Sequence, residues 1–392
     1  MKKEVLAIFL VVFVGLLGYS IILPILPLYA ESFGASPLTA GLLFTSYAVC
    51  SFIAGPILGS LSDKHGRKPW LIFSQIGTVI GFLMMGFASS LPWLFAARIL
   101  DGLSGGNIVI AQAYVSDITE PSERAKTFGL IGVAFGLGFI VGPAIGGILA
   151  HWGGYALPAF AAAGISALSI LVTAILLPEP KREHHVTESD PKHIIQHFRK
   201  FAKDPNLRLM LLLFFVYTFV FYMFTTTMTL YLARTVHANA QQLGFLYGFV
   251  GLMVLIGQGG IIRVLLKYFS ERRVARYGFI SWFISFIVLL FLPKTWPFII
   301  LATTFFSLGI SQIRPTLTSM ITKTASRTEQ GKTLGVTQSV DSISAILGPT
   351  IGGIVLTYAP LPTFAILEAT GVLAGLLLVG QITGHTKEIG RI

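Results

Sequence analysis

The chain has 392 residues, of which 54% are hydrophobic and only 11% are charged, and its formal net charge is +11. A soluble domain carries about a quarter charged residues, so this composition excludes an ordinary soluble protein. The basic residues lie in short loops between apolar runs, which argues against nucleic-acid binding, and the single cysteine, Cys50, excludes a disulfide framework.

Apolar segments long enough to cross a membrane follow one another along the whole chain. About 20 apolar residues cross a hydrocarbon core of about 30 Å as a helix, and lipid offers the backbone no hydrogen-bond partners. The first run is too long for a signal peptide and has no small-residue cleavage site, so we interpret it as a membrane helix. The sequence predicts an all-α membrane protein with twelve transmembrane helices, at roughly 5–28, 39–61, 70–90, 92–117, 125–149, 157–178, 208–232, 242–264, 276–293, 296–320, 334–356 and 362–383.

One long polar stretch divides these segments into six plus six. We expect an N-terminal six-helix bundle over 1–178, a cytoplasmic central linker over 179–207 and a C-terminal six-helix bundle over 208–392. The linker holds four of the eight histidines, at positions 184, 185, 193 and 197. Their spacing is compatible with metal binding, but a solvated linker is favoured, and we predict no metal site.

The distribution of lysine and arginine indicates the orientation. If the N-terminus is cytoplasmic, Arg98 and Arg314 lie within spans, Arg234 and Lys294 lie outside, and the other 24 of the 28 basic residues lie on the cytoplasmic side. Such an excess is typical of cytoplasmic loops. One missed span would invert every later loop, so the bias supports twelve spans with both termini in the cytoplasm. The net charge is then explained by topology and by contact with anionic lipids.

The two halves of the chain contain a repeat. Residues 122–147 align without gaps to residues 328–353, and ten of the 26 positions are identical, including a shared GPxxGG pattern. The repeat relates span 5 to span 11, and a shift of six spans preserves the direction of the helix. Parallel repeats about an axis along the membrane normal are typical of transporters that move two half-bundles around a midplane site.

A compact polar loop, "GSLSDKHGRKP" at 59–69, joins spans 2 and 3 on the cytoplasmic side. Gly59 allows neighbouring helices to approach closely, Gly66 allows a tight turn, and Asp63 is placed to bond a helix N-terminus. The guanidinium of Arg67 suits a carboxylate, for which Asp117 is the nearest candidate. These residues, with Lys68, suggest a conformational latch; the alternative is a positively charged anchor with a turn.

This loop resembles the signature loop of the major facilitator superfamily. Three further stretches are similar to motifs of its drug–proton antiporter branch: "LGYSIILPILP" (17–27) in span 1, "RILDGLSGG" (98–106) in span 4 and "GFIVGPAIGG" (138–147) in span 5. The likeness covers nearly the whole chain and is closest to tetracycline and multidrug efflux proteins, including their quinolone-exporting relatives. The second-half loop departs from the pattern, because Arg263 stands where an Asp is expected, so any latch there is weaker or differently built.

The resemblance implies a major facilitator fold of two pseudo-symmetric six-helix bundles that works by alternating access. It implies export of a lipophilic compound in exchange for protons, with no cofactor beyond the proton gradient and no enzymatic activity. The expected partners are a lipophilic small molecule, protons and membrane lipids. We expect a monomer in the inner (plasma) membrane that binds no nucleic acid.

Ionisable side chains inside the predicted spans are candidates for proton coupling, because such groups are costly in a membrane. Arg98 and Asp101 lie three residues apart on one face of span 4. Arg314 of span 10 and Asp341 of span 11 are expected to pair across two helices. Protonating either Asp would free its Arg partner and bias a two-state bundle; alternatively, each pair neutralises itself and only fixes helix packing. Glu368 of span 12 is a further candidate, although a peripheral position is more typical of this layout.

Glycine, proline and aromatic residues mark candidate interfaces and walls. Small residues at helical spacing indicate close helix contact, either as a leak-tight interface between half-bundles or as ordinary packing; they are Gly138, Gly142, Pro143, Gly146 and Gly147 in span 5, and Gly348, Pro349, Gly352 and Gly353 in span 11. Spans 1, 4, 7 and 10 line the cavity in the family that the chain resembles. Their polar and aromatic residues are substrate-cavity candidates or lipid-facing side chains: Tyr19, Asn107, Gln112, Tyr217 and Tyr222.

The leading hypothesis is therefore a proton-driven antiporter that exports drugs or other amphipathic compounds. A proton-coupled transporter of a specific metabolite, sugar or lipid, by symport or by export, is the alternative. A membrane receptor or scaffold is disfavoured by the intramembrane Arg–Asp pairs and by the repeat.

Overall fold

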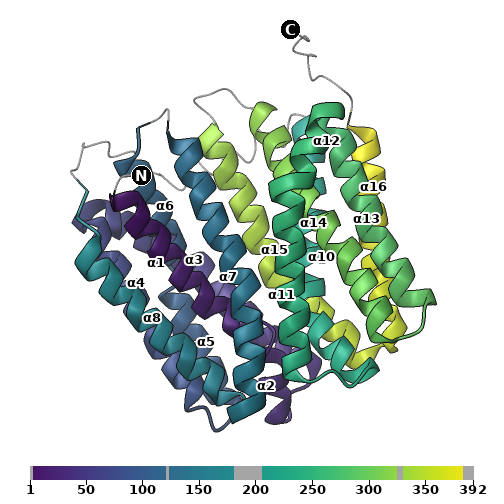
Figure 1. Ribbon diagram of the computed structural model, residues 1–392, viewed down its shortest axis with the longest axis horizontal. Helices are drawn as coiled ribbons and strands as arrows, with labels where there is room; N and C mark the ends of the chain where they lie inside the picture. The colour runs from purple at the N-terminus through teal and green to yellow at the C-terminus, as the bar shows by residue number, and fades with distance from the viewer. Residues whose placement is uncertain (1–2, 121–122, 181–204, 325–329, 383–392) are drawn as a thin grey trace. The chain divides into compact units, whose positions relative to one another are not determined.

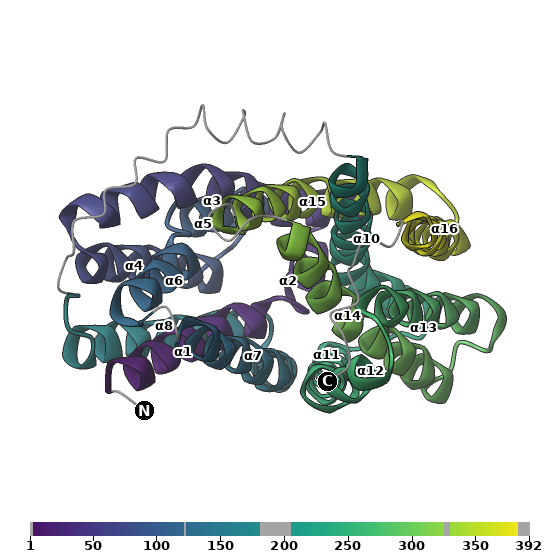
Figure 2. The same cartoon turned by 90° about the horizontal axis from the view of Figure 1, so that it is seen from above.

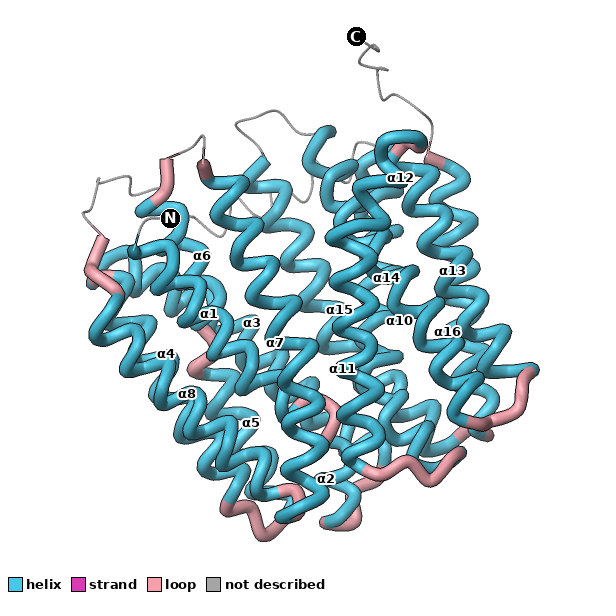
Figure 3. Tube along the Cα trace, viewed as in Figure 1, coloured by secondary structure: helices cyan, strands magenta, loops and turns pink. Residues whose placement is uncertain are grey.

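The computed structural model describes residues 3–120, 123–180, 205–324 and 330–382. These residues form helices joined by short loops, and no strand occurs among them (Figure 3). The predicted all-α class is therefore confirmed. The linker histidines and residues 181–204 of the predicted linker lie outside the described residues.

The helices follow one another in chain order (Figure 1). Their bounds are α1 Lys3–Ile22, α2 Leu26–Ser32, α3 Pro37–His65, α4 Arg67–Gly86, α5 Leu91–Leu103, α6 Asn107–Ile118, α7 Arg124–Gly153, α8 Ala156–Leu176, α10 Pro205–Thr235, α11 Ala240–Ile256, a π-helical turn η1 Gly257–Ile261, α12 Ile262–Tyr268, α13 Glu271–Phe291, α14 Trp296–Thr324, α15 Gln330–Tyr358 and α16 Leu361–Gln381.

Twelve spans long and apolar enough to cross a membrane occur in the described part of the chain, and they match the twelve predicted segments one for one. The first span consists of α1 and α2, the fourth of α5 and α6, and the eighth of α11, η1 and α12. Each of the other nine is a single helix. The protein is therefore a multi-pass membrane protein.

Interruptions divide these three composite spans. Span 1 breaks between Ile22 and Leu26, where Pro24 cannot donate a backbone hydrogen bond, as its sequence predicts. Span 4 breaks between Leu103 and Asn107, and span 8 widens into a π-turn at Gly257–Ile261. Where the backbone of a membrane span is irregular, its freed N–H and C=O groups need hydrogen-bond partners from neighbouring helices. We therefore expect polar side chains of other helices beside these three interruptions.

The chain divides into two compact units. The first contains Met1–Thr187, Tyr222–Met253 and Ala345–Phe364, and the second contains Glu188–Phe221, Val254–Ser344 and Ala365–Ile392. Within the first unit α1 packs along α7 and α8, and α4 packs along α8 and α5 (Figure 2). Within the second unit α13 packs along α14. The six-plus-six domain boundaries stay a prediction.

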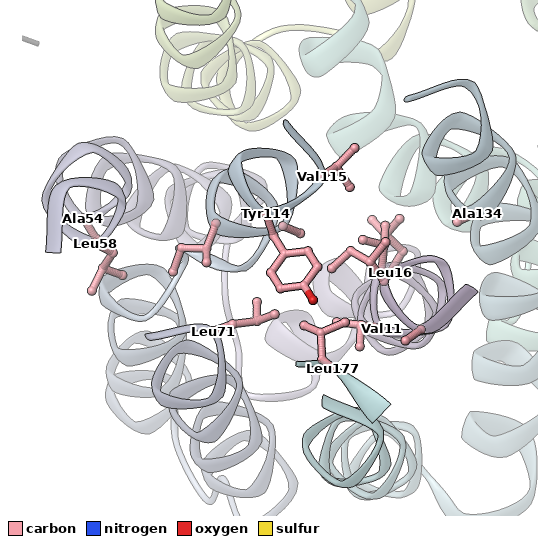
Figure 4. Close-up of a cluster of buried hydrophobic side chains, with 14 residues drawn as sticks. Val11, Leu16, Ala54, Leu58, Leu71, Tyr114, Val115, Ala134 and Leu177 are labelled. Carbon is pink, nitrogen blue, oxygen red and sulfur yellow. The ribbon is translucent and has the colours of Figure 1, made fainter. Parts of the chain in front are cut away.

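A hydrophobic cluster in the first unit joins α1, α3, α4, α6, α7 and the end of α8 around Tyr114 (Figure 4). The ring of Tyr114 is fully buried, and its hydroxyl donates to the carbonyl oxygen of Pro178 at 2.7 Å. When a tyrosine ring is buried, its hydroxyl usually forms a hydrogen bond. This hydrogen bond therefore fixes the chain just after α8, beside the polar loop that joins α3 to α4.

Candidate functional site

A buried ion pair lies in span 4 of the first unit. Nη1 of Arg98 is 2.8 Å from Oδ2 of Asp101, and the two residues are only 2% and 4% exposed. The structure thus places together the two residues that the sequence puts three apart on one face of α5. In a low-dielectric setting, removing either partner would leave the other charge uncompensated.

Aromatic rings and glycines complete the surroundings of this pair. The guanidinium carbon of Arg98 lies 4.1 Å from the ring centroid of Tyr47, a cation–π arrangement. The ring of Tyr19 lies 5.9 Å from that of Tyr47, which places this substrate-cavity candidate beside the pair. A Cβ on Gly81 would lie 2.9 Å from Cβ of Asp101, so the glycine allows α4 to approach α5 here.

The helix breaks two residues after Asp101, following Leu103. Ser74 of α4 spans the break: its hydroxyl donates to the carbonyl oxygen of Ser104 and accepts from the backbone N–H of Gly106 at 3.0 Å. These bonds satisfy backbone groups that a continuous helix would pair internally. Sequence reasoning missed the break, although Gly105 and Gly106 were a signal for it, because glycine weakens a helix interior.

A second Arg–Asp pair lies in the second unit. Nη2 of Arg314 in α14 is 3.3 Å from Oδ1 of Asp341 in α15. The side chain of Asp341 is buried, whereas that of Arg314 is 45% exposed. One turn along α15, the hydroxyl of Ser344 lies 2.7 Å from that of Thr218 in α10. The pair therefore belongs to a polar contact line between α10, α14 and α15.

Glu368 differs from the two aspartates. It is 0% exposed in the middle of α16, and among the described residues neither carboxyl oxygen has a hydrogen-bond partner. No sequence motif around Glu368 indicated this isolation.

The remaining substrate-cavity candidates have different surroundings. Nδ2 of Asn107 donates to the hydroxyl of Thr78 at 3.2 Å, beside the span 4 break. Tyr217 is buried, with its ring 5.9 Å from that of Trp282, and so forms part of the core of the second unit. Gln112 is exposed and Tyr222 is partly buried.

The loop between α3 and α4 contains a cluster of charged groups. Arg67 forms an ion pair with Asp63, donates from Nε to Oδ2 of Asp117 at 2.7 Å, and donates from Nη1 to the hydroxyl of Ser62 at 2.9 Å. The structure thus places Arg67 and Asp117 together across α4 and α6. Gly59 lies against Val109 of α6, where a Cβ would be 3.4 Å from Cγ1.

One acid in this cluster was missed by sequence reasoning. Glu179 accepts from the backbone N–H groups of Arg67 at 2.6 Å and Lys68 at 2.9 Å, at the N-terminus of α4. Asp63, which was expected to bond the N-terminus of an adjacent helix, lies in the last turn of α3 and forms an ion pair with the side chain of Arg67, the first residue of α4. The ammonium group of Lys68 donates to the carbonyl oxygen of Ala174 at 2.7 Å. We name Asp63, Arg67, Asp117 and Glu179 the first latch cluster.

The second unit contains a counterpart with reversed charges. Glu271, at the start of α13, lies 2.7 Å from Nζ of Lys323 near the end of α14 and accepts from Ser319 at 2.6 Å. Beside it, Arg272 donates to the carbonyl oxygens of Val379 and Gly380. We name Glu271, Arg272 and Lys323 the second latch cluster. A differently built latch in the second half, expected from Arg263, stays a prediction, and Glu271, Arg272 and Lys323 are the residues proposed for it.

The GPxxGG repeat makes equivalent contacts in the two halves. A Cβ on Gly146 would meet the carbonyl of Ile21 in span 1, and one on Gly352 would meet Thr227 and Met223 in span 7. Likewise Gly147 lies against Gly244 of span 8, and Gly353 lies against Leu38 of span 2. Gly138 and Gly142 also face α1, at Leu16 and Ser20, while Gly348 is buried.

The backbone carbonyl oxygens of Pro143 and Pro349, the prolines of the GPxxGG repeat, lie against glycines of neighbouring helices. A Cβ on Gly244 would meet the carbonyl oxygen of Pro143, and one on Gly41 would meet that of Pro349. Small residues permit such close backbone contact between membrane helices. These contacts all lie within the first unit, so spans 5 and 11 are packed against spans 8 and 2 there.

Polar contacts reinforce this packing at the end of the helices that is remote from the first latch cluster. Nη2 of Arg234 lies 2.9 Å from Oε1 of Glu31. The backbone N–H of Leu38 donates to the hydroxyl of Thr357 at 2.9 Å. Further along α3, the hydroxyl of Thr45 lies 2.8 Å from that of Thr350. We name Glu31, Leu38, Arg234 and Thr357 the outer contact.

Twelve spans in repeated halves, with small-residue helix contacts and buried Arg–Asp pairs, define a secondary transporter. The sequence profile of the Major Facilitator Superfamily matches residues 8–268 and 261–388. The chain therefore belongs to the Major Facilitator Superfamily.

Known proteins agree with this assignment. The chain is 27% identical to the class H tetracycline resistance protein of Pasteurella multocida over 389 residues, covering 97% of this chain and 96% of that protein. It is 24% identical to the quinolone resistance protein NorA of Staphylococcus aureus (strain MSSA476) over 384 residues, covering 97% and 96% of the two chains. The crystal structure of the human organic anion transporter MFSD10 has the same fold, with a TM-score of 0.73, 21% identity and coverage of 96% and 99%.

Proposed function

We propose that the protein is a proton-coupled antiporter that exports drugs and related amphipathic compounds. It works by alternating access as a monomer in the plasma membrane, with both termini in the cytoplasm. The likeness to tetracycline and quinolone resistance proteins over nearly the whole chain supports this substrate class. The lysine and arginine distribution supports the orientation.

The observation that carries the proposal is the buried Arg98–Asp101 pair beside the broken turn of span 4. A proton bound to Asp101 removes the negative charge that faces Arg98, while Tyr47 continues to hold the guanidinium. The charge on the pair thus changes without loss of its packing. Because the helix breaks within one turn of Asp101, that change acts where span 4 is least constrained by its own hydrogen bonds.

The Arg314–Asp341 pair is proposed to respond in the same way in the second unit. Its partial exposure, on the Arg314 side, gives protons and water a route to the pair. Protonation of either aspartate biases the equilibrium between two conformations only to the extent that the two conformations differ in their affinity for the proton. The latch clusters and the outer contact supply contacts that one conformation has and the other must break.

The test is transport by the purified protein in liposomes, with tetracycline, norfloxacin and ethidium as probes. When the lumen is more acidic than the outside, we expect the drug to accumulate in the lumen while protons leave, and a protonophore to abolish the accumulation. Accumulation driven only by an alkaline lumen would indicate symport and contradict the proposal. Absence of flux for every probe would also contradict it.

A further inference from the structure

Three acidic side chains in the described part of the chain, those of Asp101, Asp341 and Glu368, lie more than a turn from either end of a span, and their surroundings differ. Asp101 and Asp341 each have a guanidinium within ion-pair distance. Glu368 has none, and its two carboxyl oxygens have no hydrogen-bond donor among the described residues. Two of the acids are therefore placed to be ionised, and the third is not.

Glu368 is turned into the protein rather than toward lipid. Its neighbours Ala365 and Val372, on the same face of α16, are buried, while Ile366 and Leu367 are exposed. From the start of α16 at Leu361, a rise of 1.5 Å per residue puts Glu368 about 10 Å into the span. The carboxyl is therefore remote from both water and lipid headgroups.

Among the described residues, no charged side chain of the helices that pack on this face pairs with Glu368. One turn beyond it, a Cβ on Gly371 would lie 2.6 Å from Val220 of α10, and one on Gly375 would meet Phe279 of α13. On α10, the ring of Tyr217 lies edge-on to Trp282 of α13, and the ring of Tyr231 packs against Phe364 of α16, one turn before Glu368. The arginines of α13 that reach α16 do so near its other end.

These arginines are too far along the helix to compensate Glu368. Arg272 bonds the carbonyls of Val379 and Gly380, and Arg276 lies 3.9 Å from the Cβ position of Gly380. Twelve residues of helix between Glu368 and Gly380 correspond to about 18 Å. Arg314 of α14 and Asp341 of α15 form an ion pair with each other.

We propose that the carboxyl group of Glu368 is a proton-binding site that is occupied in this conformation. An ionised carboxylate here would have neither a cation nor a donor, and burying such a group costs far more than burying the neutral acid. The protein therefore holds one proton on α16 in this conformation. The proton leaves when α16 separates from α10 and α13 and water reaches the carboxyl. This last step rests on the proposed antiport function.

The site itself is tested by infrared spectroscopy of the full chain in lipid vesicles at neutral pH. A protonated carboxyl absorbs apart from carboxylates, and ¹³C-labelled glutamate distinguishes Glu from Asp. We expect a protonated-carboxyl band that shifts on labelling and is lost in Glu368→Gln. Glu271→Gln, which removes an ion-paired acid at a helix end, is the matched control and should retain the band.

The absence of the band from the wild-type protein, its failure to shift with labelled glutamate, or its persistence in Glu368→Gln would overturn the proposal. If Glu368→Gln does not fold, the labelling of the wild-type protein decides the matter alone. Coupling is measured separately: Glu368→Gln should retain downhill drug flux and lose gradient-driven accumulation. Full coupling in that variant would overturn the role of the proton in transport. A wild-type protein without proton-driven flux would refute the antiport function but leave the infrared result to judge the site.

Discussion

The carboxylate of Glu271 lies 2.7 Å from the ammonium group of Lys323, and this pair occupies the same place in the second half as Arg67 and Asp117 in the first, with the charges reversed. In each half, the first residue of the third membrane span pairs with a residue near the end of the fourth span. The basic residue that follows donates to a backbone carbonyl near the end of the sixth span: Lys68 to that of Ala174, and Arg272 to that of Gly380. The position of the contact is thus repeated even where the residue types are not.

A charge swap tests this second latch cluster. Lys323→Glu places two acids together and should weaken the contact, whereas Glu271→Lys combined with Lys323→Glu should restore it. Because the pair is partly exposed, the coupling energy should be about 0.2–1 kcal/mol. Thermal unfolding of the single and double variants in detergent measures it. Additive effects of the two substitutions, with no rescue, would show that the pair contributes nothing.

Gly66 is expected to tolerate no side chain. Its φ of +112° with ψ of 144° lies in a region that is nearly restricted to glycine, and a Cβ there would lie 3.0 Å from Glu179. Gly66→Ala should cost about 1–3 kcal/mol of stability. Gly164→Ala, at a helical glycine with open space around it, is the matched control. Equal unfolding temperatures for the two variants would contradict the account of this turn.

Arg234→Gln should loosen the outer contact. The substitution removes the ion pair with Glu31 and the 3.4 Å hydrogen bond to the carbonyl of Leu356. Both side chains are partly exposed, so the expected effect is about 0.2–1 kcal/mol in favour of conformations in which this end is open. Spin labels at positions 34 and 359 report the change as a longer mean distance. Arg234→Lys, which keeps the charge, should change the distance less, and an unaltered distance in Arg234→Gln would count against the outer contact as a gate.

Arg98 is expected to be irreplaceable by other residues. Arg98→Ala leaves the buried carboxylate of Asp101 without a counter-ion, which should cost about 3–5 kcal/mol. Arg98→Lys keeps a positive charge but loses the planar group that lies over Tyr47. This variant should therefore fold, but its transport should be weak. Purified yield and unfolding temperature separate the two outcomes. A stable Arg98→Ala variant would mean that the pair is not the compensated unit that its geometry indicates.

The sequence predicted the spans because the length of an apolar run alone decides whether a helix crosses a bilayer. It also indicated the Arg98–Asp101 pair, since residues three apart share a helix face. Long-range partners were harder to predict. Glu179 lies 112 residues from Arg67, and only the fold brings it to the N-terminus of α4. The second latch cluster was hidden because its charges are reversed, and the isolation of Glu368 depends on which side chains neighbouring helices present.

The break in span 4 illustrates the same limit. Two consecutive glycines weaken a helix, but many membrane helices contain such pairs without breaking. Here the hydroxyl of Ser74, on another helix, satisfies the freed groups of Ser104 and Gly106. The sequence of span 4 contains the weakness, while the sequence of span 3 supplies the partner.

The most direct test of the central claim, that protonation of buried acids drives export, is proton-gradient-driven drug accumulation by Asp101→Asn in liposomes. The isosteric amide keeps the packing around Arg98 but cannot exchange a proton. We predict that downhill drug exchange persists and that accumulation against a gradient is lost. Accumulation at the wild-type level by the folded variant would contradict the account.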